Sequence, residues 1–259
     1  MFILCSVSVN GTACSTLASK NVDPGVERVL LGAAGNHQAE FVALMRQIPR
    51  VRFSTRKIDL FTAVTLGNGN AIFRTVTEGG TGNSTYVSLT GTNNYTLSVP
   101  RRISWQQGGP AILEGEMIFL SSTGAAAPIT VGSTTGDVTA EADVWSGDMD
   151  QVYSISIDFG FDIALPPDGL LYQKHVFVRA QRPVISIGTY ANSYITTANV
   201  NPGSISTLTA ILAKVADGGV RGTQSNYAVT GHYVLGGIDG SKPGTVMVTC
   251  AGKGGITIT

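Results

Sequence analysis

The chain carries the same stretch of sequence twice, and this internal repeat constrains its fold more than any other feature. The stretch Gln38 to Phe53 (QAEFVALMRQIPRVRF) reappears as Tyr172 to Ile187 (YQKHVFVRAQRPVISI), a spacing of 172 − 38 = 134 residues. Further on, Ala71 to Gly80 (AIFRTVTEGG) returns as Ala210 to Gly219 (AILAKVADGG), a spacing of 210 − 71 = 139. Because the order is preserved and the spacing drifts only slightly, the repeat indicates a tandem duplication with loop insertions.

The length and the repeat together predict two domains, residues 1–147 and residues 148–259. The formal net charge is zero and the pI is near neutral, so the bulk charge does not indicate binding to nucleic acid or to a membrane. Charged residues make up 13% of the chain, against a usual share of about 25%. A surface so poor in charge suits a protein that buries much of itself against neighbours.

The cysteines and the N-terminal segment bear on the compartment. Cys5, Cys14 and Cys250 are odd in number and show no CxxC spacing, which argues against a disulfide framework. The opening MFILCSVSV has no basic region before it and alternates as a strand does, so it predicts a first strand and not a targeting signal. No apolar run approaches the roughly 18 residues of a membrane span. We therefore expect folding in a reducing cytoplasm.

Most segments alternate with period two and are rich in Val, Ile, Thr and Tyr, between turns marked by Gly, Asn and Pro. This pattern predicts a mainly β protein. The segments with the clearest alternation are Val51 to Thr55, Tyr95 to Val99, Ala111 to Leu120, Tyr153 to Ile163, His175 to Ala180, Tyr233 to Gly237 and Thr245 to Cys250.

One short α-helix is expected in each copy, at equivalent places. Arg56 to Gly67 brings apolar residues near helical spacing, with Thr55 available as the N-cap and Gly67 as the stop. Tyr190 to Val200 is the matching segment of the second copy, although its Thr and Asn content weakens helix formation.

Two insertions break the symmetry between the copies. Gly11 to Asn36 is predicted to be a long loop of the first copy, without a match in the second, and loops of this length are usually functional or disordered. Ser121 to Thr139, rich in Gly, Ala and Thr, is predicted to be a connector before the second copy.

The sequence shows no local signature of catalysis. Its three histidines lie far apart, without a neighbouring Cys or His at metal-ligand spacing, and no GxSxG motif is present. The GGTG at Gly79 to Gly82 lacks the Lys of a phosphate-binding loop and is typical of a hairpin turn. Glu114 and Glu116 share one face of a strand, as a glycosidase pair could, but no flanking aromatic residues indicate a sugar site. We therefore predict no enzyme activity, no cofactor and no metal.

Charges are unevenly distributed along the chain. Basic residues crowd the segment from Arg46 to Lys57, whereas the acidic residues from Asp137 to Asp168 run without an intervening Lys or Arg. These could be two solvated faces, or an acidic connector of one subunit could meet the basic strand of another, or the acidic run could face a lumen through which DNA passes. The residues expected at assembly interfaces and repeat turns are Gly79, Gly80, Gly218, Gly219, Arg50, Arg52, Arg56, Asp148 and Asp150.

The order of the segments resembles that of tail tube proteins of long-tailed bacteriophages. The resemblance rests on VPRRISWQQGGPAILEGE (Val99 to Glu116), then SIDFG (Ser156 to Gly160), then a strand ending RAQRP (Arg179 to Pro183). It covers nearly the whole chain and depends on pattern and order, without a catalytic motif.

This resemblance implies a β-sandwich flanked by a helix, whose subunits join edge to edge so that their sheets form a β-barrel around a channel. Stacked rings would form the tail tube of the virion after assembly in the host cytoplasm, and the predicted long loop from Gly11 to Asn36 would bridge successive rings. The implied partners are further copies of the chain, other tail proteins and DNA that passes through the lumen without sequence-specific binding; no membrane is implied. A duplicated chain could build the pseudo-sixfold barrel from three copies.

Two further interpretations remain open at this stage. One is a tail hub, distal tail or tube-terminator protein of the same fold, present as a single ring. The other is a capsid decoration protein or adhesin, in which the duplication would add valency.

Overall fold

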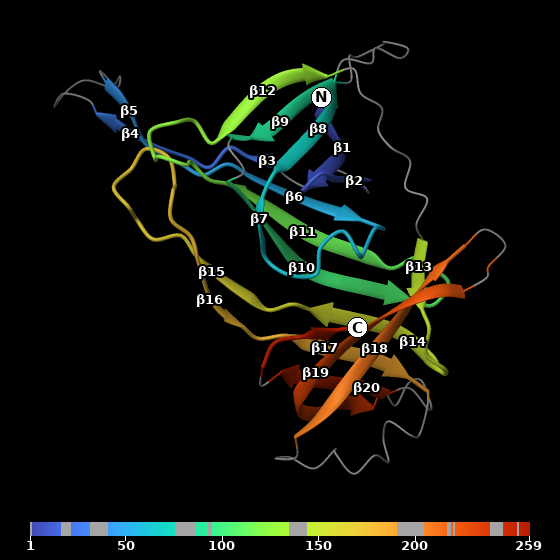
Figure 1. Ribbon diagram of the computed structural model, residues 1–259. Coiled ribbons are helices and arrows are strands. Elements are labelled where there is room, and N and C mark those ends of the chain that lie inside the picture. Colours follow the sequence, from blue (N-terminus) through green and yellow to red (C-terminus); the bar gives the residue numbers. More distant parts are fainter. Residues whose placement is uncertain are drawn as a thin grey trace.

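The computed structural model describes residues 2–16, 22–31, 41–75, 86–92, 95–134, 144–190, 205–216, 219, 221–238, 246–252 and 254–259. In these residues the protein is mainly β, as the alternating sequence pattern predicts (Figure 1). The expected first strand is present as β1 (Phe2–Val9), and the segments with the clearest alternation all form or contribute to strands.

The remaining strands of the N-terminal part are β2 (Thr12–Ser15), β3 (Val22–Asp23), β4 (Val26–Leu31), β5 (Phe41–Gln47), β6 (Arg50–Thr55), β7 (Thr65–Gly67), β8 (Gly69–Thr75), β9 (Tyr86–Gly91), β10 (Thr96–Gln106), β11 (Ile112–Phe119) and β12 (Ile129–Thr134). The C-terminal part contains β13 (Val144–Gly147), β14 (Val152–Asp158), β15 (Phe161–Ala164), β16 (Phe177–Gln181), β17 (Val184–Thr189), β18 (Ile205–Val215), β19 (Arg221–Ile238), β20 (Val246–Gly252) and β21 (Thr257–Ile258). We call β1 to β12 the first half and β13 to β21 the second half.

A 12-stranded sheet runs through both halves, in the order β13-β18-β19-β20-β17-β14-β10-β11-β6-β3, with β21 beside β19 and β7 beside β10. A 5-stranded sheet has the order β12-β9-β8-β1-β2. Two antiparallel pairs stand outside these sheets: β4 with β5, which we call the first arm, and β15 with β16, which we call the second arm. Figure 1 shows the first arm projecting from the rest of the fold.

Strand pairing follows the same order in both halves. The second half is ordered β13-β18-β19-β20-β17-β14. The first half has matching pairings that are divided between two sheets: β1-β8-β9 in the 5-stranded sheet, and β7-β10-β11-β6-β3 in the 12-stranded sheet. Strand β12 lies beside β9 as β21 lies beside β19. The register agrees as well, since Val22 opposes Val51 in the first half and Ile157 opposes Ile185 in the second.

Both halves place the same turn between the edge strand and the arm. The Gly25 N–H donates to Asp23 Oδ1 at 2.8 Å, and the Gly160 N–H donates to Asp158 Oδ1 at 2.8 Å. The two glycines have φ of +56° and +61°, a left-handed conformation that glycine adopts without steric cost. An aspartate that bonds the backbone two residues later favours such a turn, so the two Asp-x-Gly sequences explain the shared geometry.

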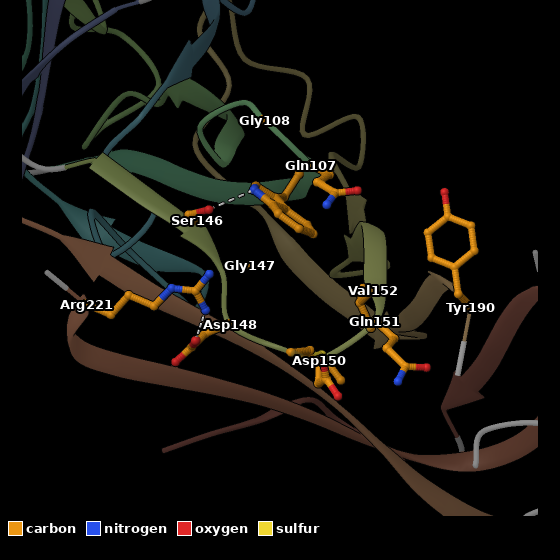
Figure 2. Close-up of a pocket in the computed structure, with 12 residues that line it drawn as sticks. Gln107, Gly108, Ser146, Gly147, Asp148, Asp150, Gln151, Val152, Tyr190 and Arg221 are labelled. Atoms are coloured by element: carbon orange, nitrogen blue, oxygen red, sulfur yellow. Dashed lines mark hydrogen bonds and ion pairs between the residues drawn. The ribbon is translucent and has the colours of Figure 1, made fainter. Parts of the chain in front are cut away.

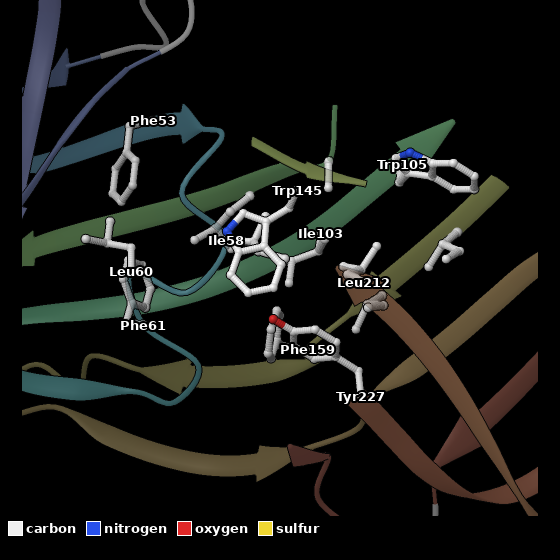
Figure 3. Close-up of a cluster of buried hydrophobic side chains, with 14 of the residues drawn as sticks. Phe53, Ile58, Leu60, Phe61, Ile103, Trp105, Trp145, Phe159, Leu212 and Tyr227 are labelled. Carbon is white, nitrogen blue, oxygen red and sulfur yellow. The ribbon is translucent and has the colours of Figure 1, made fainter. Parts of the chain in front are cut away.

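The main hydrophobic core covers one face of the long sheet across both halves (Figure 3). Ile103 opposes Leu113 on β11 and Ile157 on β14, and all three side chains are fully buried. Figure 3 shows Trp145, Phe159 and other side chains from both halves converging on this layer. One core is shared by strands of both halves, so the two halves pack against each other.

The first predicted helix is wrong. Residues 56–64 form consecutive turns, followed by β7. Thr55 Oγ1 does accept the Lys57 N–H, at 3.2 Å, but the chain then closes short turns such as Leu60 N–H to Lys57 O. The turns bury Ile58, Leu60 and Phe61, a spacing that one face of a single helical turn does not provide. Of the second predicted helix, residues 191–200 lie outside the described residues.

The predicted long loop and connector are also wrong where they are described. Within Gly11 to Asn36, strands β2, β3 and β4 are formed, and β3 and β4 occupy the places that β14 and β15 occupy in the second half. Within Ser121 to Thr139, β12 is formed and pairs with β9. The sequence signal was weak because β3 has two residues, too few to show alternation.

Candidate functional site

The two halves are joined by a strand pairing that extends one sheet into the other. The second part of β10, from Arg102 to Gln106, pairs antiparallel with β14 from Asp158 to Ser154. The first part of β10 pairs instead with β7, at Thr96 to Ser98. Strand β14 thus fills the side of β10 that β7 leaves open, and it makes the edge of the second half an interior strand of the 12-stranded sheet.

The corresponding edge of the first half has an exposed outer side. Strand β3 pairs with β6, and the described strands include no partner on its other side. Its Val22 is 38% exposed, whereas its counterpart Ile157 in β14 is 0% exposed. The difference follows from the neighbours, because β14 is flanked by β10 and β17, while β6 is the one partner of β3 among the described strands. An uncovered sheet edge is a template for pairing with another chain.

The second half offers a matching open position on β19. Strand β18 pairs with β19 as far as Ile205 opposite His232, while β20 continues along the other side to Ile238. Among the described strands, none pairs with the β18 side of β19 beyond His232. By register, the part of β19 beyond His232 corresponds to the part of β10 that runs from Leu97 toward the residues paired with β14.

Arg50 and Arg52, predicted at an interface, surround a buried carboxylate of their own chain. Glu116 is 2% exposed, and its Oε1 lies 3.6 Å from both Arg50 Nη1 and Arg52 Nε. Arg101 donates to Glu116 Oε2 from Nε at 3.0 Å and from Nη2 at 2.5 Å. Three guanidinium groups around one carboxylate leave this region with an excess of positive charge, and the Glu114–Glu116 pair does not resemble an open glycosidase site.

Asp148 and Asp150 lie in the turn between β13 and β14, beside a surface hollow of about 490 Å³ (Figure 2). Asp148 accepts hydrogen bonds from Arg221 Nη1 and from Gln224 Nε2, the latter at 2.5 Å, so it ties this turn to β19. Asp150 is exposed, as is Arg56 in the turn after β6. Within the chain, Arg221 therefore offsets part of the charge of the acidic turn, and Glu116 offsets part of the charge of the basic strand β6.

The hydrogen bond from Arg221 holds the pKa of Asp148 below its ordinary value, against the opposing effect of partial desolvation. A carboxyl whose pKa is lowered by folding stabilises the fold above its ordinary pKa, and this contribution is lost as the pH falls through the folded-state pKa. We expect Asp148→Asn to lower the free energy of unfolding at pH 7 by less than about 1 kcal/mol, because the ion pair is near the surface.

Urea unfolding at pH 7 and at pH 3 checks this prediction. The difference between Asp148→Asn and the unmodified protein should shrink at the lower pH, because pH 3 lies below the ordinary pKa of an aspartate and the stabilisation is lost as the pH falls through the lowered pKa of Asp148. Asp150→Asn, an exposed change in the same turn, is the control and should have little effect at either pH. A difference that is constant with pH would contradict the ionic role of Asp148.

The predicted turn glycines are only partly within the described residues. Gly219 has φ of +80°, and a Cβ built on it would meet no atom within 4 Å, as expected for an exposed turn. Gly79, Gly80 and Gly218 lie outside the described residues.

Sequence reasoning missed the residues that hold the second arm against the first half. Arg46 Nη2 donates to Leu165 O at 3.2 Å and to the side chain of Gln173, which is 0% exposed. The Gln47 N–H donates to Leu171 O at 2.8 Å. The sequence does contain a signal for the turn between each edge strand and its arm, since Asp23-Pro24-Gly25 and Asp158-Phe159-Gly160 both precede an arm. A pattern of three residues is too short to identify such a turn by itself.

The described part of the chain contains no group of three or more His, Cys, Asp or Glu side chains that could hold a metal ion. In the same residues, no helix is long and apolar enough to cross a membrane.

Among known proteins, no protein-family model matches the chain, and no curated protein sequence matches it.

Proposed function

We propose that this protein is a structural component of a virion that assembles head to tail into rings, which stack to form the tail tube of a long-tailed bacteriophage. Each chain is interpreted as two copies of one tail-tube-like unit, so three chains close a ring of six units. The proposed function is structural, namely to form the wall of a tube, and no catalytic step is assigned. The resemblance of the sequence to tail tube proteins supplies the biological setting of this proposal.

The observation that carries the proposal is the β10–β14 junction. Inside the chain, the edge strand of one half extends the sheet of the other half, whereas the equivalent edge strand β3 has no described strand on its outer side. If the same kind of strand pairing forms between chains, β3 of one copy lies beside the end of β19 in the next copy. Such contacts are heterologous, so they form a closed ring if the rotation closes and an open filament if it does not.

The face of the sheet opposite the core suits the lining of a channel. Along β10, β14 and β17, serines alternate with the core isoleucines, and Ser156 opposes both Ser104 and Ser186. The flanking Arg102 donates from Nε to Ser156 Oγ at 3.0 Å. A lining of small hydroxyl side chains would let DNA pass without sequence-specific contacts, which come from hydrogen bonds to base edges. We propose that this face lines the lumen.

Electron microscopy of the purified protein tests the proposal. Tubes of stacked rings, each of three chains by mass measurement, are the expected result. Single rings that never stack would favour the tail hub or tube-terminator alternative, and low copy number per virion would support that reading. A chain that remains monomeric at millimolar concentration would contradict both.

A further inference from the structure

The second arm covers an apolar surface of the first half. Leu97 and Ile118, opposite each other on β10 and β11, are 4% and 1% exposed. They lie on the face of the sheet opposite the main core and form a separate cluster with Val99, Ile48 and Leu120. Four side chains of the second arm and of the loop that joins its strands pack against this cluster: Phe161, Ile163, Leu165 and Val176. The arm therefore acts as a cover that one half lays over the other.

The equivalent surface of the second half is exposed as far as the described residues show. By register, His232 and Ala251 correspond to Leu97 and Ile118, because each pair lies opposite across the equivalent strands. Both are exposed, and Ile205, which opposes His232, is 48% exposed. We call Ile205, His232 and Ala251 the second-half patch. The described residues include no arm that packs on it.

The first arm has apolar side chains that the described residues do not cover. Val26, Val29, Leu44 and Met45 are 37%, 39%, 41% and 56% exposed. The two arms are attached alike, since each follows its edge strand through an Asp-x-Gly turn with the same hydrogen bond. The position of an edge strand therefore sets the position of its arm. Strand β14 pairs with β10, and the arm that follows β14 lies over the sheet to which β10 belongs.

From this relation we propose that the first arm of one copy lies over the second-half patch of a second copy. The proposal rests on the head-to-tail assembly proposed above and adds a second contact to each junction between chains. Pairing of β3 with β19 sets the register of the sheets, and the arm covers Ile205 and its neighbours. Both the exposed apolar residues of the arm and the exposed patch are then buried together, as expected for residues at the centre of an interface.

Charge-introducing variants test the two sides of this contact. Leu44→Asp combined with Met45→Asp alters the arm, and Ile205→Asp alters the patch; these side chains are exposed, so each variant should fold. Each should raise the concentration needed for half-assembly at least tenfold. Val131→Asp, on β12 and 65% exposed, is the matched control and should leave ring formation unchanged.

Mixing the two variants separates a specific contact from a general loss of solubility. The arm variant keeps an intact patch and the patch variant keeps an intact arm, so together they should form a 1:1 complex that does not close into rings. A photo-crosslinking residue at position 205 of the assembling protein should attach to residues 26–47 of another copy. Assembly of the unmodified protein with cross-links elsewhere would overturn the arm contact alone, whereas a protein that stays monomeric would overturn the arm contact and the proposed function together.

Discussion

Gly160→Ala is expected to lower the free energy of unfolding by about 2–4 kcal/mol. Gly160 has φ of +61°, and a Cβ placed on it would lie 1.9 Å from the carbonyl oxygen of Arg182. That clash is with backbone, and the Arg182 N–H donates to Gly160 O at 2.9 Å, so relieving the clash would strain or break the hydrogen bond. The loss combines the cost of a left-handed residue, roughly 1–2 kcal/mol, with the cost of moving the neighbouring chain.

Gly169→Ala is the matched control for this prediction. Gly169 also has a positive φ, +71°, but a Cβ there would meet no atom within 4 Å. Its replacement should therefore cost only the conformational part, about 1–2 kcal/mol. Urea unfolding monitored by circular dichroism gives both values. Equal losses at the two positions would show that the contact with Arg182 does not constrain this turn.

The same experiment at Gly25 compares the two halves. Gly25 has φ of +56°, and its Cβ would lie 1.9 Å from the carbonyl oxygen of Ile48. The local geometry matches that of Gly160, whereas the sheet around it differs, because β14 is an interior strand and β3 lies at an edge. We expect Gly25→Ala to destabilise the isolated chain less than Gly160→Ala, because an edge strand can shift its backbone to relieve the clash while disturbing fewer neighbouring strands. We also expect Gly25→Ala to reduce assembly.

The sequence predicts the β class and the repeat from strong local signals, and it misses what depends on contacts between distant residues. Alternation identifies β6 and β17, and their bounds lie 134 residues apart, as the repeat spacing requires (184 − 50). The Arg56 to Gly67 helix fails because Ile58, Leu60 and Phe61 are drawn into the core by tertiary packing, which overrides a marginal helical pattern. A helix in water needs more length or packing than this segment provides.

The candidate interface was predicted less well than the fold class. Arg50 and Arg52 lie in a segment with a high density of basic residues, but their partner in the structure is Glu116, a residue more than 60 positions away (116 − 52 = 64). Periodicity reveals which face of a strand is buried, but it does not reveal which strands are neighbours. For this reason the sequence could not identify β3 as an exposed edge, although it contains the Asp23-Pro24-Gly25 turn that marks it.

Val22→Asp is expected to abolish ring formation while leaving the isolated chain folded. In the single chain Val22 is 38% exposed, so an aspartate there remains in contact with water and should change the stability by less than about 1 kcal/mol. Between chains, the side chain would take the position that Ile157 takes inside the chain, where it is fully buried beside Ile103. An unpaired carboxylate in that place is costly, and charges on edge strands are a known barrier to edge pairing.

Two comparisons make the Val22 experiment decisive. Ile157→Asp places the same charge at the junction that lies within the chain, so it should destabilise the fold itself by more than about 3 kcal/mol or prevent soluble expression. Val131→Asp removes an equally apolar side chain from β12 and should leave assembly intact. Sedimentation velocity and electron microscopy report assembly, and urea unfolding reports stability. If Val22→Asp still forms rings at the concentration of the unmodified protein, β3 does not lie at the junction between chains, and the closing edge must be sought elsewhere on the sheet.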